Sequence, residues 1–199
     1  PKIIADECEI DVVSDFRNNH IKLGGEGAPL VPEFHQKIFS KKNIPLVVLN
    51  IGGISNFTYL DGNDEFFGSD CGPGNALMDI YCQNFLNRPF DKNGERAKNG
   101  EVHIPSLNKM LAHPFFKRRH PKSTGKEIFN IKFIPKKLLK KSSNDVLATL
   151  TELSAICIKK SIHTLKEIPH KVIICGGGQK NKFLVSSIEQ RIEMALTSS

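Results

Sequence analysis

The chain has 199 residues, of which 39% are hydrophobic and 25% charged, a composition typical of a soluble globular protein. No apolar stretch approaches the roughly 20 residues that a membrane-spanning helix needs, and residues 1–13 alternate acidic and apolar side chains unlike a signal peptide. The five cysteines are widely spaced and form no CxxC pair, so we expect free thiols in a reducing, cytoplasmic setting rather than disulfides or a zinc site.

The net charge of +7 is concentrated in one segment. Residues 117–141 carry ten Lys or Arg against the single Glu127, whereas the rest of the chain has 18 basic and 20 acidic residues. Phenylalanines interleave with this segment but form no nucleic-acid reading motif. We therefore favour a solvated basic face and expect no nucleic-acid partner. Polyanion binding and a basic rim on a phosphate site are the alternatives.

The first predicted elements form a β-hairpin. Residues 46–49 are an apolar strand, and residues 57–60 are its partner across a Gly52-Gly53 turn. A third strand leads through Phe66 and Phe67 to Asp70 and is broken at Gly72-Pro73-Gly74. A helix from about 75 to 86 then follows, and its apolar stripe contains Leu77, Met78, Cys82 and Phe85.

The second half of the chain predicts two helices around one strand. Residues 91–120 read as a loop with at most short helical pieces, and residues 144–165 as a long helix. Residues 171–175 form a buried strand that ends at three glycines. The closing amphipathic helix points Phe183, Leu184, Ile188, Ile192 and Leu196 inward. Alternating strands and helices predict an α/β fold.

Three glycine clusters follow predicted strands: Gly52-Gly53, Gly72-Pro73-Gly74 and Gly176-Gly177-Gly178. α/β folds gather ligands at the carboxyl ends of strands, and bare backbone amides bind phosphate, but glycine also serves ordinary turns. The P-loop pattern GxxxxGK[ST] and the dinucleotide pattern GxGxxG are both absent. A nucleotide or phosphate site of another type and a purely structural role therefore stand level.

Asp70 lies between two of these clusters. A carboxylate beside a phosphate site can act as a base on an incoming nucleophile. The alternative is that Asp70 caps the helix that starts near Asn75. The seven histidines show no HxxxH or HxH spacing, so we predict no metal ligand among them.

Six short motifs follow one another along the chain and together cover nearly all of it. They are SDFR (14–17), GGEGAPLVP (24–32), NIGGISN (50–56), DCGPGN (70–75), PKSTGKE (121–127) and CGGG (175–178) with Asn181. In this order they resemble the signatures of the anhydro-N-acetylmuramic acid kinase family. The resemblance implies an α/β, sugar kinase/actin/Hsp70-like (ribonuclease H-like) lobe, with a mixed sheet flanked by helices and an incomplete first lobe.

The resemblance also implies an activity. Members convert 1,6-anhydro-N-acetylmuramic acid to N-acetylmuramic acid 6-phosphate with ATP and Mg²⁺, and water opens the anhydro ring, in peptidoglycan recycling. A cytoplasmic homodimer is the implied state, with no nucleic acid and no membrane as partner.

At residue level the resemblance makes Asp70 the catalytic base. Arg17 would pair with the sugar's carboxylate, and a surface ion pair with Asp15 is the alternative. Lys122, Ser123, Thr124 and Lys126 could contact the ligand, but we favour a basic loop. The implied cofactor-binding residues are Asn50, Gly52, Gly53, Asn56, Gly72, Gly74, Asn75, Gly176, Gly177, Gly178 and Asn181.

The chain also departs from the family pattern. Members are longer and begin with a glycine- and serine-rich phosphate-binding hairpin, so we expect residues 1–44 to be the end of the first lobe and residues 45–199 most of the second, nucleotide-binding lobe. Cys71 replaces a usual Thr, Ser69 an aromatic residue and Glu26 a usual Gln. A non-catalytic, truncated remnant of such a kinase is therefore the alternative function.

Overall fold

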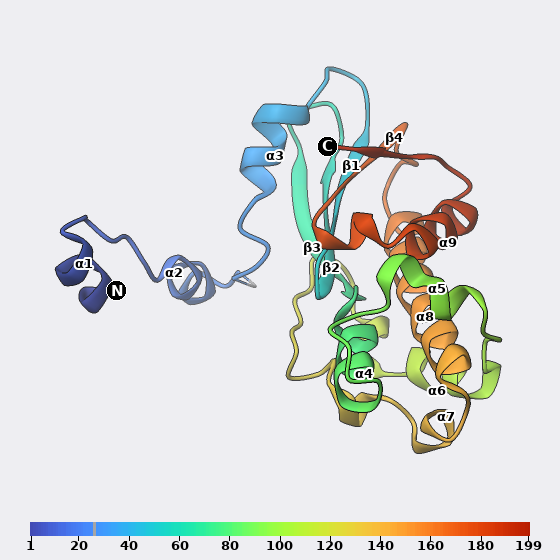
Figure 1. Ribbon diagram of the computed structural model, residues 1–199. Helices are drawn as coiled ribbons and strands as arrows, with labels where there is room; N and C mark the ends of the chain where they lie inside the picture. Colours follow the sequence, from blue (N-terminus) through green and yellow to red (C-terminus); the bar gives the residue numbers. More distant parts are fainter. Residues whose placement is uncertain (26) are drawn as a thin grey trace.

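The computed structural model describes residues 1–25 and 27–199, and a mixed sheet forms its centre (Figure 1). Within these residues the sheet has five strands in the order β3-β2-β1-β4-β5. The middle strand β1 is antiparallel to β2 and parallel to β4, while β3 is antiparallel to β2 and β5 parallel to β4. The strands are β1 (Leu46–Ile51), β2 (Ile54–Leu60), β3 (Phe66–Pro73), β4 (Lys171–Cys175) and β5 (Leu196–Ser198).

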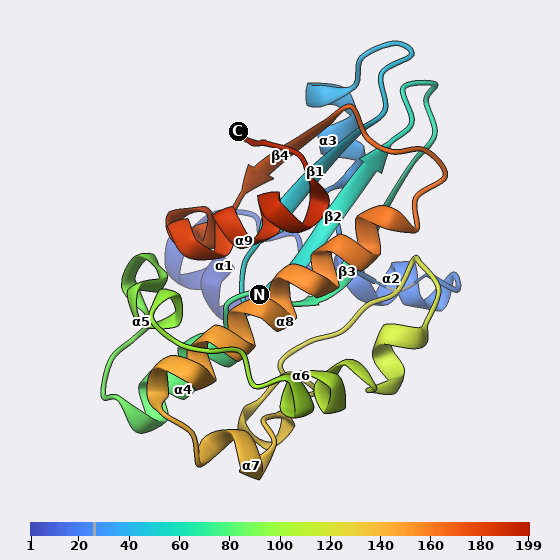
Figure 2. The ribbon, with the colours of Figure 1, turned by 90° about the vertical axis from the view of Figure 1, so that its right-hand side faces the viewer.

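The main core lies on one face of the sheet, beneath two long helices. Helix α8 (Ser143–His163) crosses this face, and α9 (Lys182–Ile192) packs beside it (Figure 2). The hydroxyl of Ser142 accepts a hydrogen bond from the Asp145 nitrogen at 3.2 Å and so caps α8. Side chains of β1 that point to this face, Val47, Leu49 and Ile51, are fully buried.

Short helices fill the space beside α8 and α9. Their bounds are α4 (Ala76–Phe85), α5 (Glu95–Lys98), α6 (Ile104–Leu111) and α7 (Lys136–Leu139), with 3-10 turns η1 (Lys92–Gly94), η2 (Pro114–Lys117), η3 (Ile131–Phe133) and η4 (Gly177–Lys180). A cluster of phenylalanines joins η2 to η3, and the rings of Phe115 and Phe129 meet edge-on at 5.6 Å. These phenylalanines therefore belong to the core rather than to a nucleic-acid surface.

The opposite face of the sheet is covered by α3 (Pro32–Phe39). His35 Nδ1 lies 2.8 Å from Thr58 Oγ1, which fixes this helix to β2. Helices α1 (Lys2–Cys8) and α2 (Phe16–Lys22) bury no residue and extend away from the sheet (Figure 1).

Most of the predicted elements are confirmed, among them the hairpin, the strand at 171–175, the long helix and the short helical pieces between 91 and 120. All five cysteines fall in the described part of the chain and are free thiols, as predicted. The same part of the chain contains no helix that is both long and apolar enough to cross a membrane.

Three expectations were wrong. Phe85 is 52% exposed, and Tyr81 takes its place on the buried face of α4. Strand β3 continues to Pro73 because Gly72 and Pro73 still pair with β2 beyond a bulge. Leu196 lies in β5 because α9 ends at Ile192, where Glu193 adopts a left-handed conformation with φ 56°.

Candidate active site

The three glycine clusters lie together at one end of the sheet, where strands β1, β3 and β4 end. β3 and β4 both run in the direction of β1, so their carboxyl ends lie together. The turn after β1 is tied to the chain after β3, because Gly74 N donates to Gly53 O at 2.8 Å and Asn75 N to Gly52 O at 2.9 Å. The prediction that glycine clusters stand at strand ends is confirmed for Gly52-Gly53 after β1 and for Gly176-Gly177-Gly178 after β4, whereas Gly72 lies in the last residues of β3.

Two of these glycines lie so close to neighbouring atoms that a side chain has no room there. A Cβ on Gly74 would lie 2.3 Å from Gly52 O. Gly176 has a φ of +84°, and a Cβ there would lie 2.3 Å from Asn50 Oδ1. Both positions therefore exclude larger residues for structural reasons alone.

Asp70 lines a cavity of about 460 Å³ beside the turn after β1. Asp70 is opposite Asn56 in the β2–β3 register, and Asn56 is opposite Asn50 in the β1–β2 register. Opposite residues point to the same face of a sheet, so the three polar side chains form a row across three strands. The lining of this cavity is Arg17, Ala28, Pro29, Leu30, Val31, Asn50, Ile54, Asn56, Asp70, Thr124, Gly125 and Lys126.

Asp70 is only 4% exposed as a residue, and its carboxylate is held by the segment 122–124. Thr124 N donates to Oδ2 at 2.8 Å, and Ser123 Oγ donates to the same oxygen at 3.3 Å. Asp70 N donates in turn to Lys122 O at 2.9 Å. These bonds fix the orientation of the carboxylate toward the cavity.

The alternative that Asp70 caps a helix is wrong. Asp70 lies inside β3, and α4 has Asn75 at its N-cap position without a side-chain capping bond. Residues 122–126 form neither helix nor strand, in agreement with the loop interpretation, and Thr124, Gly125 and Lys126 line the Asp70 cavity. No local pattern marks them as neighbours of Asp70, because the contact spans 54 positions.

A second cavity, of about 590 Å³, lies on the other side of the Gly52-Gly53 turn. It contains five of the predicted cofactor-binding residues and several cations and carboxylates that the sequence did not single out. The lining is Gly52, Gly53, Asn75, Met78, Asp79, Phe90, Asp91, Lys92, Asn93, Gly177, Lys180 and Asn181. Asn181 also caps α9, because its Oδ1 accepts from Leu184 N at 3.1 Å.

The two carboxylates of the second cavity differ in their partners. Asp91 accepts from the backbone nitrogens of Arg96 and Ala97 at 3.1 and 3.0 Å. Burial raises the pKa of Asp79 to about 6, against an opposing effect of Lys126. The described residues contain no group of three or more His, Cys, Asp or Glu that could hold a metal ion.

The remaining predicted site residues divide into two groups. Arg17 joins Asp70, Asn50 and Asn56 in the first cavity, and Asp15 accepts from Asn18 Nδ2. Neither of the ion pairs seen among the described residues, Lys37–Glu33 and Arg191–Glu152, involves Arg17. Four predicted glycines line neither of these two cavities and instead lie close to other segments of the same protein: Gly72, Gly74, Gly176 and Gly178. Glu26 lies outside the described residues.

A mixed sheet with helices on its faces and glycine turns at its carboxyl edge defines a lobe of the sugar kinase, actin and Hsp70 class. Two solved structures share this fold. The activator of 2-hydroxyisocaproyl-CoA dehydratase from Clostridium difficile superposes with a TM-score of 0.51 at 13% identity, over 84% of this chain and 57% of that one. Component A of (R)-2-hydroxyglutaryl-CoA dehydratase from Acidaminococcus fermentans gives 0.50 at 17% identity, over 84% of this chain and 59% of that one.

The sequence comparisons are more specific. Residues 1–199 match the family model of anhydro-N-acetylmuramic acid kinase, and the chain belongs to this family. The relative from gamma-proteobacterium EBAC31A08 is 53% identical over 190 residues, which cover 96% of this chain and 52% of the relative. The relative from Paraburkholderia xenovorans is 41% identical over 196 residues, covering 97% and 52%. The chain thus spans about half the length of the curated relatives it matches.

Proposed function

We propose that the intact protein phosphorylates 1,6-anhydro-N-acetylmuramic acid on O6 at the expense of ATP while water opens the anhydro ring. One observation carries this proposal. Asp70, a buried and oriented carboxylate, lies in a cavity beside the glycine turn that also lines a second cavity. Family membership names the reaction, and the two adjoining cavities offer places for its two substrates.

The Asp70 cavity fits the sugar. Asp70 accepts a proton from a water molecule whose oxygen attacks the anomeric carbon. The bond from that carbon to the bridging oxygen breaks, O6 takes the γ-phosphoryl group, and ADP leaves. Thr124 N and Ser123 Oγ hold the carboxylate during this step. Arg17 pairs with the sugar's own carboxylate, and Asn50 and Asn56 supply amide donors and acceptors beside it.

The second cavity fits the nucleotide. Gly52, Gly53 and Gly177 leave backbone open to phosphate and adenosine, and Lys92 and Lys180 add positive charge to the lining. Asp79 is the carboxylate that would bind Mg²⁺, since Mg²⁺ in phosphate sites uses one or two carboxylates together with the phosphates. Bound Mg²⁺ would neutralise phosphate charge as the phosphoryl group is transferred.

The same proposal covers the wider setting. Residues 1–44 form the end of the first lobe, and residues 45–199 form most of the second. The protein works as a cytoplasmic homodimer in peptidoglycan recycling, without a nucleic-acid or membrane partner.

The test is phosphorylation of purified 1,6-anhydro-N-acetylmuramic acid by the intact protein, followed by mass spectrometry. Asp70→Asn keeps an oxygen that can accept from Thr124 but removes the base, so turnover should fall by about 100-fold or more while ATP binding is retained. Asp11→Asn, at an exposed position, is the charge-matched control. Full turnover by the Asp70→Asn protein would remove Asp70 from this role, and no product from the unmodified protein would refute the reaction.

A further inference from the structure

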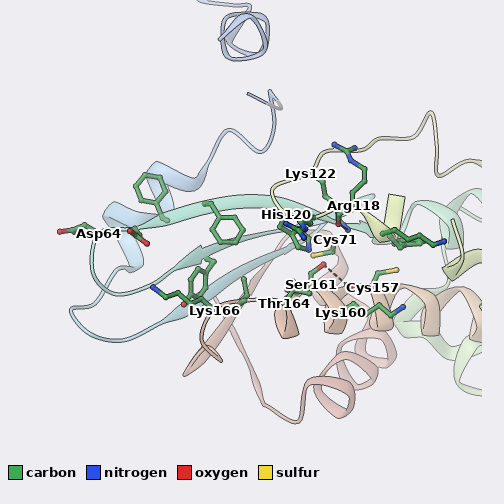
Figure 3. A pocket seen from close by; sticks show the side chains of 18 residues that line it. Asp64, Cys71, Arg118, His120, Lys122, Cys157, Lys160, Ser161, Thr164 and Lys166 are labelled. Atoms are coloured by element: carbon green, nitrogen blue, oxygen red, sulfur yellow. Dashed lines mark hydrogen bonds between the residues drawn. The ribbon is translucent and has the colours of Figure 1, made fainter. Parts of the chain in front are cut away.

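A third cavity, of about 850 Å³, is lined by Cys71 of β3 and by Cys157 of α8 (Figure 3), and Asp70 is not among its lining residues. It opens between the edge of the sheet, the second half of α8 and the segment 116–122. Neither the sugar nor the nucleotide of the proposed reaction needs it. Its lining is Tyr59, Asp64, Glu65, Phe66, Phe67, Cys71, Phe116, Lys117, Arg118, Arg119, His120, Lys122, Cys157, Lys160, Ser161, Thr164, Leu165 and Lys166.

The charge of this lining is strongly positive. The lining contains six Lys or Arg side chains and two carboxylates, those of Asp64 and Glu65. Lys117 is the last residue of η2 and Arg119 lies in the loop after it, whereas Lys160 and Lys166 come from α8 and the turn after it; all four are exposed. Among the described residues, the ion pairs Lys37–Glu33 and Arg191–Glu152 use none of these four. The four cations thus reach the cavity from two separate segments of the chain, and we call them the rim.

Lys122, another of the six cations in the lining, is fixed inside the wall of the cavity. Lys122 is 4% exposed, and its Nζ donates to Phe115 O at 3.3 Å and Arg118 O at 3.4 Å. Its Nζ also lies 4.6 Å from the centre of the Phe115 ring. Within the described part of the chain, the contacts seen for this Nζ are neutral carbonyl groups and a ring rather than a carboxylate, and a low-dielectric wall strengthens the attraction of an anion.

The cavity also has an apolar wall. Tyr59 and Phe67 lie with ring centroids 5.8 Å apart on neighbouring strands, and Phe116 and Leu165 also line the cavity. A free inorganic ion would leave this surface unused. A ligand with both a ring and a phosphate group would contact the apolar wall and the cationic rim together.

We propose that this cavity binds a small organic phosphate that carries an aromatic or similarly apolar group. The phosphate contacts the rim formed by Lys117, Arg119, Lys160 and Lys166, and the apolar group packs on Tyr59, Phe67, Phe116 and Leu165. The site is separate from the proposed reaction, since consecutive residues of β3 point to opposite faces: Asp70 lines the first cavity and Cys71 the third.

The experiment uses 1-naphthyl phosphate as the probe, with inorganic phosphate and uncharged 1-naphthol as comparison ligands. Binding is measured by calorimetry and located by amide chemical shifts in isotope-labelled intact protein, in the presence of saturating ADP. We expect naphthyl phosphate to bind more tightly than either comparison ligand. We also expect it to change the amide chemical shifts of residues 117–122 and 160–166. The affinity should fall as salt rises.

A pair of double variants locates the charge. The double variant Lys160→Gln with Lys166→Gln should lower the affinity for naphthyl phosphate by about tenfold. Lys41→Gln with Lys42→Gln removes the same charge at exposed positions before β1 and should leave the affinity unchanged. Equal losses in both double variants, equal binding of naphthol or of inorganic phosphate, or shifts confined to other residues would each overturn the proposal. None of these outcomes depends on whether the protein phosphorylates the anhydro sugar.

Discussion

The backbone nitrogen of Thr124 donates a 2.8 Å hydrogen bond to Oδ2 of Asp70, across 54 positions of the chain. Ser123 adds its hydroxyl to the same oxygen at 3.3 Å. A segment that the sequence presents as a basic loop therefore orients the carboxylate on which the proposed reaction depends.

Ser123→Ala tests this orientation. The variant loses one hydrogen bond to a charged group but keeps the stronger one from Thr124. We therefore expect kcat to fall by about fivefold with the KM for ATP unchanged, measured by steady-state kinetics. Ser14→Ala, at an exposed position, is the control and should behave like the unmodified protein. A rise in the KM for ATP with normal kcat would place Ser123 at the nucleotide instead.

Two glycine variants separate packing from binding. Gly74→Ala puts a Cβ 2.3 Å from Gly52 O, so the strand ends must move apart, and the free energy of unfolding should fall by about 2 kcal/mol or more. Gly177→Ala meets nothing within 4 Å and should unfold normally, but it narrows the second cavity and should weaken nucleotide binding. Denaturant unfolding and calorimetric titration with ADP measure the two effects. Normal nucleotide affinity in Gly177→Ala would remove the nucleotide from that cavity.

Burial, with a smaller effect of Lys122, lowers the pKa of His120 to about 4. The folded protein then binds fewer protons at this residue than the unfolded chain does between about pH 4 and 6.5. The stability that His120 contributes is present above pH 6.5 and is lost as the pH falls toward 4. In melting curves, His120→Gln should therefore flatten the decline of Tm on acidification, whereas His163→Gln, at an exposed position, should leave it unchanged. Parallel pH profiles for the unmodified protein and His120→Gln would contradict this.

Asp79 gives a prediction of the opposite sign. Its pKa is raised to about 6 by burial, so the ionised carboxylate costs stability above that pH. At pH 7.5 without ligand, Asp79→Asn should melt at a higher temperature than the unmodified protein. The same variant should need more Mg²⁺ for half-maximal activity if this carboxylate binds the ion. An unchanged Mg²⁺ requirement together with the higher Tm would leave Asp79 as a buried acid without a role at the metal.

The parts of the fold that could be predicted from sequence are those set by local patterns. Residues 46–60 show an apolar run, a Gly-Gly turn and a second apolar run, and the hairpin follows from these alone. The spacing of apolar residues gave α8, and the Ser142 cap agrees with where it begins. β5 has only three residues and exists because it pairs with β4, so nothing in its own sequence marks it.

The site was predicted in part. Asn50, Asn56 and Asp70 form a row because of the strand register, which cannot be read from the periodicity of the sequence. Both asparagines therefore line the cavity of Asp70. Thr124 was named as a possible ligand contact, but its hydrogen bond to Asp70 was not predicted, and Asp79 was missed, because tertiary packing alone brings both residues to the cavities. Local patterns find strand-end glycines, whereas the partners of a catalytic side chain depend on the packed structure.

In the proposed reaction, Asp70 directs water to the anomeric carbon while O6 is phosphorylated. This role is tested by the reaction of the intact protein with 1,6-anhydro-N-acetylmuramic acid and ATP in H₂¹⁸O, with the product analysed by mass spectrometry before its anomeric oxygen exchanges. We expect a 6-phosphate with one solvent oxygen at the anomeric carbon, and loss of this product in Asp70→Asn. A phosphorylated product without solvent oxygen, or labelled product formed at the normal rate by Asp70→Asn, would contradict it.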